Sequence, residues 1–190
     1  GFSSVEALLE HLGIRPQQTL PAMAAAFPLR VPRGFVARMA RGDAGDPLLR
    51  QVLPVLEESR EAAGYGCDPL DEHASMATPG LLHKYHGRAL LTLTGSCAIH
   101  CRYCFRRHFP YSAANPTSSN RARALAYLRQ HPDITEIILS GGDPLMLPDT
   151  RLRPLVLQLA EVPQLQTLRI HTRLPVVLPE RIDKGLLSWV

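Results

Sequence analysis

The stretch ITEIILSGGD, residues 134–143, decides the fold class, because a run of β-branched residues here ends abruptly at two adjacent glycines. Such a run predicts a buried strand followed by a turn. Apolar runs at 89–94 and 167–171 predict two further strands. Helical patterns alternate with the three strands, at residues 120–130, 151–161 and 179–190. This alternation indicates an α/β fold of βαβ units with a parallel sheet.

The chain before the first strand has a different character. Residues 1–80 predict an N-terminal helical region with connecting loops, in which turn-forming residues dominate from position 64 to 80. Helical patterns occupy 4–12, with a capping-box-like start at Ser3 and Glu6, and then 34–41 and 46–59. We therefore expect two domains, 1–80 and 81–190.

Residues 81–190 supply three βα units, too few for a closed eight-unit barrel of about 250 residues. The sequence starts at Gly1 rather than Met and stops at Val190 inside an apolar helical pattern without a cap. We expect the second domain to be the first part of a (β/α) barrel, truncated at its C-terminal side.

Composition excludes several classes of protein. With 190 residues, 45% hydrophobic and 20% charged, the chain has ordinary globular composition. The net charge of +4 favours nucleic-acid binding only weakly, because most basic residues are scattered. No run approaches a membrane span and the first residues lack a signal-peptide pattern. We expect a cytoplasmic protein without nucleic-acid or membrane partners.

The strongest chemical signal is CAIHCRYC, residues 97–104. Its CxxxCxxC spacing on a short loop allows Cys97, Cys101 and Cys104 to hold three corners of an iron–sulfur cubane, leaving one iron open. The alternative is structural zinc, which usually takes two paired ligand sets and closes four positions. Cys67 lies thirty positions upstream in a turn and is interpreted as a buried or incidental thiol.

Polar or glycine-rich segments follow each predicted strand. The cysteine loop follows the first, Gly141-Gly142-Asp143 the second and His171-Thr172-Arg173 the third. Carboxyl ends of parallel strands meet at one edge, where barrel enzymes assemble their sites. The paired glycines would let backbone approach a ligand closely and offer it amides.

These motifs resemble those of the radical S-adenosylmethionine (radical SAM) superfamily, whose signature has an aromatic, here Tyr103, before the last cysteine, and a GGE-type motif like Gly141-Gly142-Asp143. The lysine 2,3-aminomutase family is more similar still. The stretches that resemble it are 46–54, 68–70, 79–85, 101–111, 140–145 and 173–179. Within that family, 29–33 and 105–111 resemble the branch that serves elongation factor P.

The resemblance implies an isomerase that converts L-α-lysine to (R)-β-lysine with a [4Fe–4S] cluster, S-adenosylmethionine and pyridoxal phosphate. It implies a reducing electron donor and a functional link to elongation factor P and its lysyl ligase, and a homo-oligomer is compatible with it. Alternatives remain open: a catabolic lysine 2,3-aminomutase, a related enzyme acting on glutamate or arginine, or, in another class, a zinc-binding structural module.

The resemblance also assigns roles to residues. Cys97, Cys101 and Cys104 would bind the cluster, and Arg106 would receive the lysine carboxylate through its planar guanidinium. Residues assigned to S-adenosylmethionine are Tyr103, Gly141, Gly142 and Asp143.

Lys84, Tyr85 and Arg88 would face pyridoxal phosphate, although Lys84 stands where relatives often have arginine. Arg88 as a surface charge and Tyr85 as a core-edge aromatic are the alternatives. The lysine that binds this cofactor has no match here, so the 190-residue chain alone is expected to be inactive.

Five histidines lie near these motifs without a metal-ligand spacing: His83, His86, His100, His108 and His171. His100 and His108 are interpreted as loop residues, and His171 as a residue lining the site.

Overall fold

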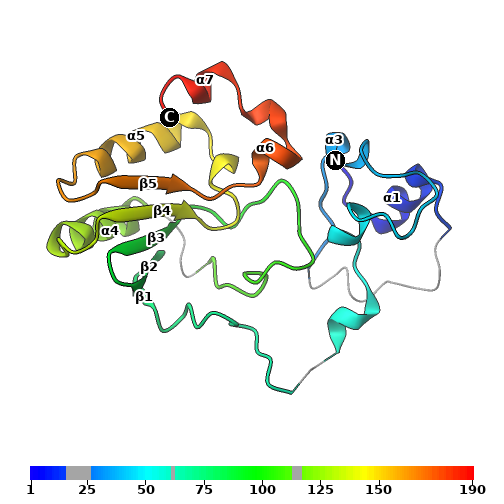
Figure 1. Cartoon of the computed structure of the whole chain (residues 1–190), viewed down its shortest axis with the longest axis horizontal. Coiled ribbons are helices and arrows are strands. Elements are labelled where there is room, and N and C mark those ends of the chain that lie inside the picture. The colour runs from blue at the N-terminus through cyan, green and yellow to red at the C-terminus, as the bar shows by residue number, and fades with distance from the viewer. Residues whose placement is uncertain (16–26, 61–62, 113–116) are drawn as a thin grey trace. The chain divides into compact units, whose positions relative to one another are not determined.

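The computed structural model describes residues 1–15, 27–60, 63–112 and 117–190 (Figure 1). The chain divides into two compact units that interleave in sequence. Unit 1 comprises Gly1–Cys67, Ala98–Arg107 and Val176–Leu178, and unit 2 comprises Asp68–Cys97, His108–Pro175 and Pro179–Val190.

A five-stranded mixed sheet forms the centre of unit 2. Its strands are β1 (Met76–Thr78), β2 (Leu81–Tyr85), β3 (Arg88–Thr92), β4 (Glu136–Ser140) and β5 (Thr167–Ile170), in the spatial order of the sequence. Strands β3, β4 and β5 are parallel, with Leu90 paired to Ile138 and Ile138 to Arg169. The sheet is open at both ends, which confirms the expected partial β/α architecture.

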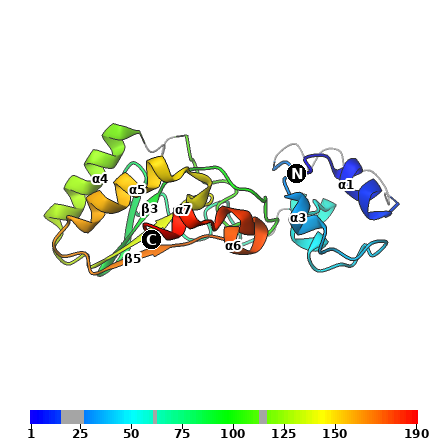
Figure 2. The ribbon, with the colours of Figure 1, turned by 90° about the horizontal axis from the view of Figure 1, so that it is seen from above.

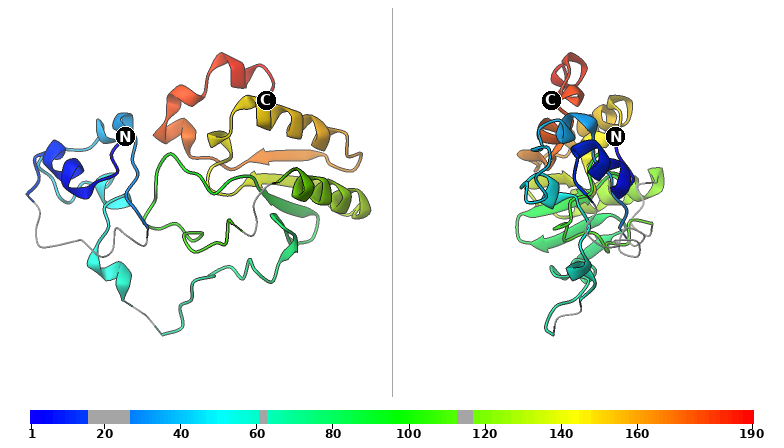
Figure 3. Two further views of the ribbon diagram at one scale, coloured as in Figure 1. Left: turned by 180° about the vertical axis from the view of Figure 1, so that it is seen from behind. Right: turned by 90° about the vertical axis from the view of Figure 1, so that its right-hand side faces the viewer.

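Two helices, α4 (Ser118–Gln130) and α5 (Asp149–Ala160), cover one face of this sheet (Figures 2 and 3). The buried residues of that side come from alternate strand positions and from the helices: Ala89, Leu91, Ile137, Leu139, Leu125, Leu128, Leu152 and Leu155. Because side chains alternate across a strand, Arg88, Leu90, Glu136 and Ile138 lie on the opposite face, which we call the open face.

The three predicted strands and the two predicted helices between them are confirmed, with bounds shifted by one or two residues. The sheet differs from the prediction in its first two strands, which are antiparallel and were not foreseen. Strand β2 carries His83, Lys84 and Tyr85 after two buried leucines, so it shows no alternating pattern. Gly87, with φ of 78°, turns the chain between β2 and β3.

Helix α1 (Val5–Leu12) opens unit 1 and is capped at both ends. The Ser4 hydroxyl, rather than that of Ser3, accepts a hydrogen bond from the Ala7 amide, and Gly13 ends the helix in the left-handed conformation. Further on, the prediction of helix at 34–41 is reduced to α3 (Arg33–Val36).

The predicted helix at 46–59 is wrong. It is replaced by two 3-10 turns, η1 (Leu49–Gln51) and η2 (Leu56–Ser59). Pro54 lies between the two turns and lacks the amide hydrogen that a continuous helix would need there. Asp46 forms a turn instead, because its carboxylate accepts hydrogen bonds from the amides of Leu48 and Leu49.

The C-terminal segment contains short elements in place of one long helix. They are α6 (Leu174–Val177), η4 (Pro179–Arg181) and α7 (Lys184–Leu187). Another short element, η3 (Pro144–Met146), lies earlier in the chain, between β4 and α5. Asp183 starts α7 by accepting a hydrogen bond from the Leu186 amide at 2.8 Å. In the described ranges, no helix combines the length and apolar character that crossing a membrane requires.

Candidate functional site

The loops that leave β3 and β4 are in direct backbone contact at the carboxyl edge of the sheet. The amide of Gly142 donates to the carbonyl of Thr94 at 2.6 Å, and the amide of Asp143 to that of Ser96 at 2.9 Å. A Cβ on Gly141 would lie 2.5 Å from the Thr94 oxygen, and one on Gly142 2.5 Å from the Ser96 oxygen. Gly141 also has φ of 125°, which favours glycine. The glycines therefore allow the loops after β3 and β4 to pack against each other. The amides of Gly142 and Asp143 donate to carbonyls of the protein itself.

Asp143 joins the loop after β4 to the loop after β5. Its carboxylate accepts hydrogen bonds from the Leu145 amide at 3.1 Å, the Thr172 hydroxyl at 2.7 Å and the Arg173 amide at 2.8 Å. Only 5% of Asp143 is exposed. The three loops that the sequence predicted to share an edge are thus linked, and Thr172, which the sequence placed at this edge without a role, is a partner of Asp143.

The three cysteines of the loop are half-buried and are not joined in a disulfide. Cys97 belongs to unit 2, one residue beyond Ser96, whereas Cys101 and Cys104 belong to unit 1. Burial raises the pKa of the Cys104 thiol above its ordinary value, and the Arg106 amide opposes that effect. Among the residues that the structure describes, no three His, Cys, Asp or Glu side chains converge on one point. What fits an iron–sulfur cluster is the donor set, three soft thiol ligands on one short loop.

Tyr103 lies within the cysteine loop and Arg106 two positions beyond Cys104, both in unit 1. Tyr103 is 63% exposed, and its hydroxyl donates to the Gln51 side-chain oxygen at 3.3 Å. Arg106 is buried, with its guanidinium carbon 4.8 Å from the centre of the Phe105 ring. An exposed phenol and a buried cation therefore flank Cys104 along the chain.

His100 packs structurally within unit 1. Its ring stacks on Phe27 with centroids 4.8 Å apart, and its Nδ1 lies 2.7 Å from the Pro28 carbonyl oxygen. Burial lowers the pKa of His100, which favours the neutral ring.

A cavity of about 150 Å³ lies on the open face of the unit 2 sheet. It brings together Lys84, Tyr85 and Arg88, the three residues that sequence reasoning grouped by resemblance. Lys84 donates to the carbonyl of Leu70, and its Nζ lies 5.7 Å from the Tyr85 ring centre. Other lining residues are Leu70, Glu72, Ser75, Leu82, Ala89, Leu90 and Ile138.

A row of charges crosses the open face at the end of this cavity. One Glu136 carboxylate oxygen lies 3.8 Å from Nε of Arg88 and 3.2 Å from Nε of Arg169. Sequence reasoning missed Glu136 and Arg169. The register of the parallel strands could have found them, because positions 88 and 136 are paired and position 169 lies diagonally across from 136.

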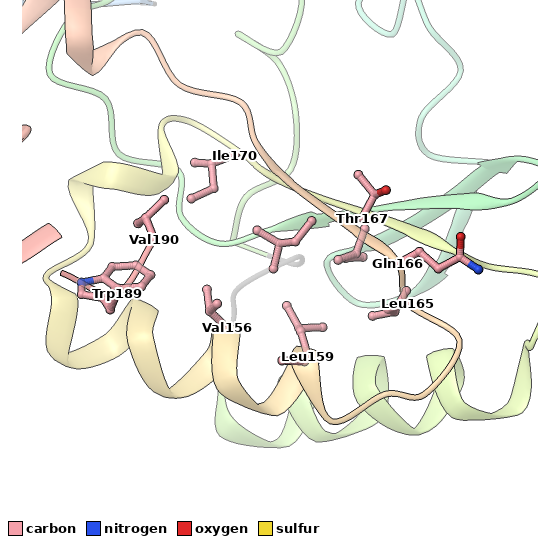
Figure 4. A pocket seen from close by; sticks show the side chains of 11 residues that line it. Val156, Leu159, Leu165, Gln166, Thr167, Ile170, Trp189 and Val190 are labelled. Carbon is pink, nitrogen blue, oxygen red and sulfur yellow. The ribbon is translucent and has the colours of Figure 1, made fainter. Parts of the chain in front are cut away.

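The larger cavity, about 410 Å³, lies between β5, α5 and the residues Trp189 and Val190 (Figure 4). In the described part of the chain, no charged side chain lines it. Its polar lining side chains are those of Gln166 and Thr167, so it offers no cation to a phosphate or carboxylate group. The charged candidate residues lie at the carboxyl edge and on the open face instead.

Comparison with known proteins agrees with these features. Residues 91–184 match the Radical SAM superfamily. The chain is 50% identical to the L-lysine 2,3-aminomutase of Escherichia coli (strain K12), over 96% of this chain and 54% of that protein. It is 44% identical to the enzyme of the same name from Haemophilus influenzae, over 95% and 54%, and 37% identical to that of Clostridium subterminale, over 82% and 38%. The chain thus spans about half the length of the curated relatives it matches.

Proposed function

Because the chain belongs to the radical SAM superfamily and, within it, to the lysine 2,3-aminomutase family, we propose that the protein is an isomerase that converts L-α-lysine to (R)-β-lysine. Membership of this superfamily implies a [4Fe–4S] cluster and S-adenosylmethionine. Pyridoxal phosphate is proposed as the third cofactor, because it is implied by the aminomutase relatives.

The linked loops at the carboxyl edge of the sheet are the observation that carries this proposal. Gly142 and Asp143 bond to the carbonyls of Thr94 and Ser96, so the residue preceding Cys97 is fixed against the GGD motif. Parallel β/α folds place reacting groups at this edge. A cluster ligand and the proposed S-adenosylmethionine segment therefore belong to one packed substructure.

Cys97, Cys101 and Cys104 are the proposed cluster ligands. Tyr103, Gly141, Gly142 and Asp143 are proposed to surround S-adenosylmethionine. In this arrangement Asp143 acts by fixing the loops, since its carboxylate already accepts three hydrogen bonds from the protein.

The cavity on the open face supports a phosphate site. Lys84 and Arg88 line it, and Arg169 lies beside Arg88 at the shared carboxylate of Glu136. Three cations against the two carboxylates of Glu136 and Glu72 leave a net positive charge, which suits a phosphate group. We propose that Lys84 and Arg88 hold the phosphate of pyridoxal phosphate and that Tyr85 packs beside it.

When bound, the cluster with S-adenosylmethionine supplies one-electron chemistry, and pyridoxal phosphate supplies the carbonyl group that carries a migrating amine. This chain's own contribution is binding and orientation. Arg106 is proposed to hold the lysine carboxylate, for which a buried guanidinium offers two parallel charge-assisted bonds.

We further propose that the β-lysine serves the modification of elongation factor P through a partner ligase, and that a cytosolic reductant supplies the electron. Cysteines of the loop that are not joined in a disulfide are compatible with the reducing cytosol. A homo-oligomer is also proposed.

Product analysis of the full-length protein tests the function. The anaerobically reconstituted enzyme is incubated with L-lysine, S-adenosylmethionine, pyridoxal phosphate and dithionite, and amino acids are separated by chromatography. We expect (R)-β-lysine. Rearranged glutamate or arginine without β-lysine would overturn the lysine assignment, and one bound zinc without iron would overturn the radical chemistry.

A further inference from the structure

A partly buried ion-pair cluster in unit 1 joins Glu58 to the cysteine loop. One oxygen of the Glu58 carboxylate accepts a hydrogen bond from Nε of Arg102 at 2.9 Å. The other accepts from an Nη atom of Arg102 and from Nη1 of Arg107, the latter at 3.0 Å. The exposed fractions of the three side chains are 11% for Glu58, 6% for Arg102 and 18% for Arg107. One carboxylate thus holds two guanidinium groups away from solvent.

Phe27 completes the cluster. Its carbonyl accepts a hydrogen bond from Nη1 of Arg102 at 2.7 Å. The guanidinium carbons of Arg102 and Arg107 each lie 5.0 Å from the centre of its ring, within the range of cation–π attraction. Two cations, one anion and an aromatic ring leave one net positive charge.

The two arginines bracket the second half of the cysteine loop. Arg102 directly follows Cys101, and Arg107 stands three positions after Cys104. Glu58 therefore ties together both ends of a six-residue segment that contains Cys104. The amide of Arg102 also donates to the Gln51 carbonyl at 2.8 Å, so the backbone is held as well as the side chains.

Stability alone is a weak explanation for this cluster. The desolvation cost of buried ion pairs often cancels their attraction, and apolar residues of similar volume can replace them without loss. A carboxylate that fixes two arginines in one geometry gives positional accuracy instead. Groups around metal ligands commonly orient those ligands and tune the metal.

We propose that Glu58 is a positioning residue for the iron–sulfur site: it holds the segment carrying Cys101 and Cys104 in the shape that receives the cluster, and its charge offsets the two arginines beside it. The inference rests on the proposed function for the presence of the cluster. It assigns a role to the N-terminal region, in which the sequence analysis placed no site residue.

Cysteine reactivity in the cluster-free, full-length protein tests the positioning directly. Glu58→Gln keeps the shape of the side chain but removes the charge. Glu57→Gln is the matched control, because Glu57 is the adjacent acid and is exposed. Iodoacetamide labelling of Cys101 and Cys104, followed by peptide mass spectrometry, should be about tenfold faster in Glu58→Gln and unchanged in Glu57→Gln, because local opening becomes easier.

The reconstituted protein gives the second readout. Loss of a negative charge near an anionic cluster favours the reduced state, so the midpoint potential in a spectroscopic redox titration should rise in Glu58→Gln. Iron should also transfer to a chelator faster. If Glu58 only stabilised the fold, the midpoint potential of Glu58→Gln would equal that of the wild-type protein.

Wild-type labelling rates and an unchanged potential in Glu58→Gln would overturn the inference. Should that variant fail to fold by circular dichroism, Arg107→Met keeps the Glu58–Arg102 pair and is expected to speed labelling to a smaller extent; no change there would equally overturn it. Labelling needs neither lysine nor cluster, so altered labelling with no β-lysine formation would defeat the proposed function alone.

Discussion

The Thr172 hydroxyl donates a hydrogen bond of 2.7 Å to the Asp143 carboxylate, which joins residues 29 positions apart in the sequence. The other carboxylate oxygen accepts from the next amide, that of Arg173. Asp143 also starts η3 through the Leu145 amide. One buried carboxylate therefore sets the relative positions of the loops that follow β4 and β5.

We expect Asp143→Ala to lower the free energy of unfolding by about 2–4 kcal/mol, because it leaves three donors without their acceptor. Thr172→Val should cost about 2 kcal/mol, the value of two hydrogen bonds, because the hydroxyl also accepts one from the Leu174 amide at 3.0 Å. Urea unfolding of both variants and the double variant measures the coupling. Because the two side chains share one bond, the double variant should lose less than the sum of the single losses. If the loss in the double variant equals the sum of the two single losses, the Asp143–Thr172 hydrogen bond does not contribute to stability.

Gly142→Ala should destabilise the protein by about 2 kcal/mol or more, because its Cβ would lie 2.5 Å from the Ser96 oxygen. The loop that leads to Cys97 should also move, and alkylation of Cys97 in the cluster-free protein should be faster. Gly66→Ala is the control, since nothing lies within 4 Å of its added Cβ. Equal unfolding free energies for the two variants would show that the loops can separate without cost.

The strands of the parallel half of the sheet were predictable because they are apolar and because β-branched residues favour strands. The shared location of the loops that follow these strands was also predictable, because the carboxyl ends of parallel strands lie at the same edge of a sheet. Strand β2 was missed, because Lys84 and Tyr85 occupy strand positions that face a cavity rather than a core. The local sequence pattern fails to predict a strand whose polar side chains line a cavity.

The partners of the cysteine loop were beyond sequence reasoning for a different reason. Glu58 precedes Arg102 by 44 positions, and no local pattern signals a contact of that separation. The region around Glu58 was predicted as helix, yet Pro54 and the Asp46 turn break it. Motifs could indicate the cysteines, but only the folded chain shows what holds them.

Affinity for pyridoxal phosphate tests the cavity on the open face. Lys84→Met and Arg88→Met should each weaken binding about tenfold or more, because each removes a cation from a phosphate site. Glu136→Gln should strengthen it, since this carboxylate competes for Arg88 and Arg169. Absorbance titration of the cofactor-free, full-length protein gives the dissociation constants.

Arg123→Met is the matched control, because Arg123 is exposed on α4, the helix that covers the opposite face. Unchanged affinity for pyridoxal phosphate in both the Lys84 and Arg88 variants would show that its phosphate binds outside this cavity. Weaker binding in Glu136→Gln would show that the carboxylate positions the arginines rather than competing for them.

Stability at acid pH should depend on Asp46, which is buried in unit 1. The Ala40 amide holds the pKa of its carboxyl below the usual value, with the Leu49 and Leu48 amides acting in the same direction and burial opposing them. A lowered folded pKa gives stability that is full above the unfolded value and lost as the pH falls through the folded value.

Asp46→Asn should therefore be less stable than the unchanged protein at pH 7, and the difference should shrink below about pH 4, where the unfolded carboxyl takes up its proton. Urea midpoints at pH 7, 5, 4 and 3 measure this. A difference that stays constant across that range would mean that the hydrogen bonds do not depend on the charge of Asp46.

Removal of single thiols tests the cluster assignment most directly. Cys97→Ala, Cys101→Ala and Cys104→Ala should each reduce iron from about four per chain to a small fraction of that, because three thiolates are the only protein ligands a site-open cubane has. Cys67→Ala is the control, since this thiol is exposed and lies outside the motif. Iron and sulfide analysis with electron paramagnetic resonance of the reduced protein distinguishes the four variants. Equal iron loss in Cys67→Ala would mean that a fourth cysteine closes the site, and an iron without a protein ligand would then no longer be available to S-adenosylmethionine.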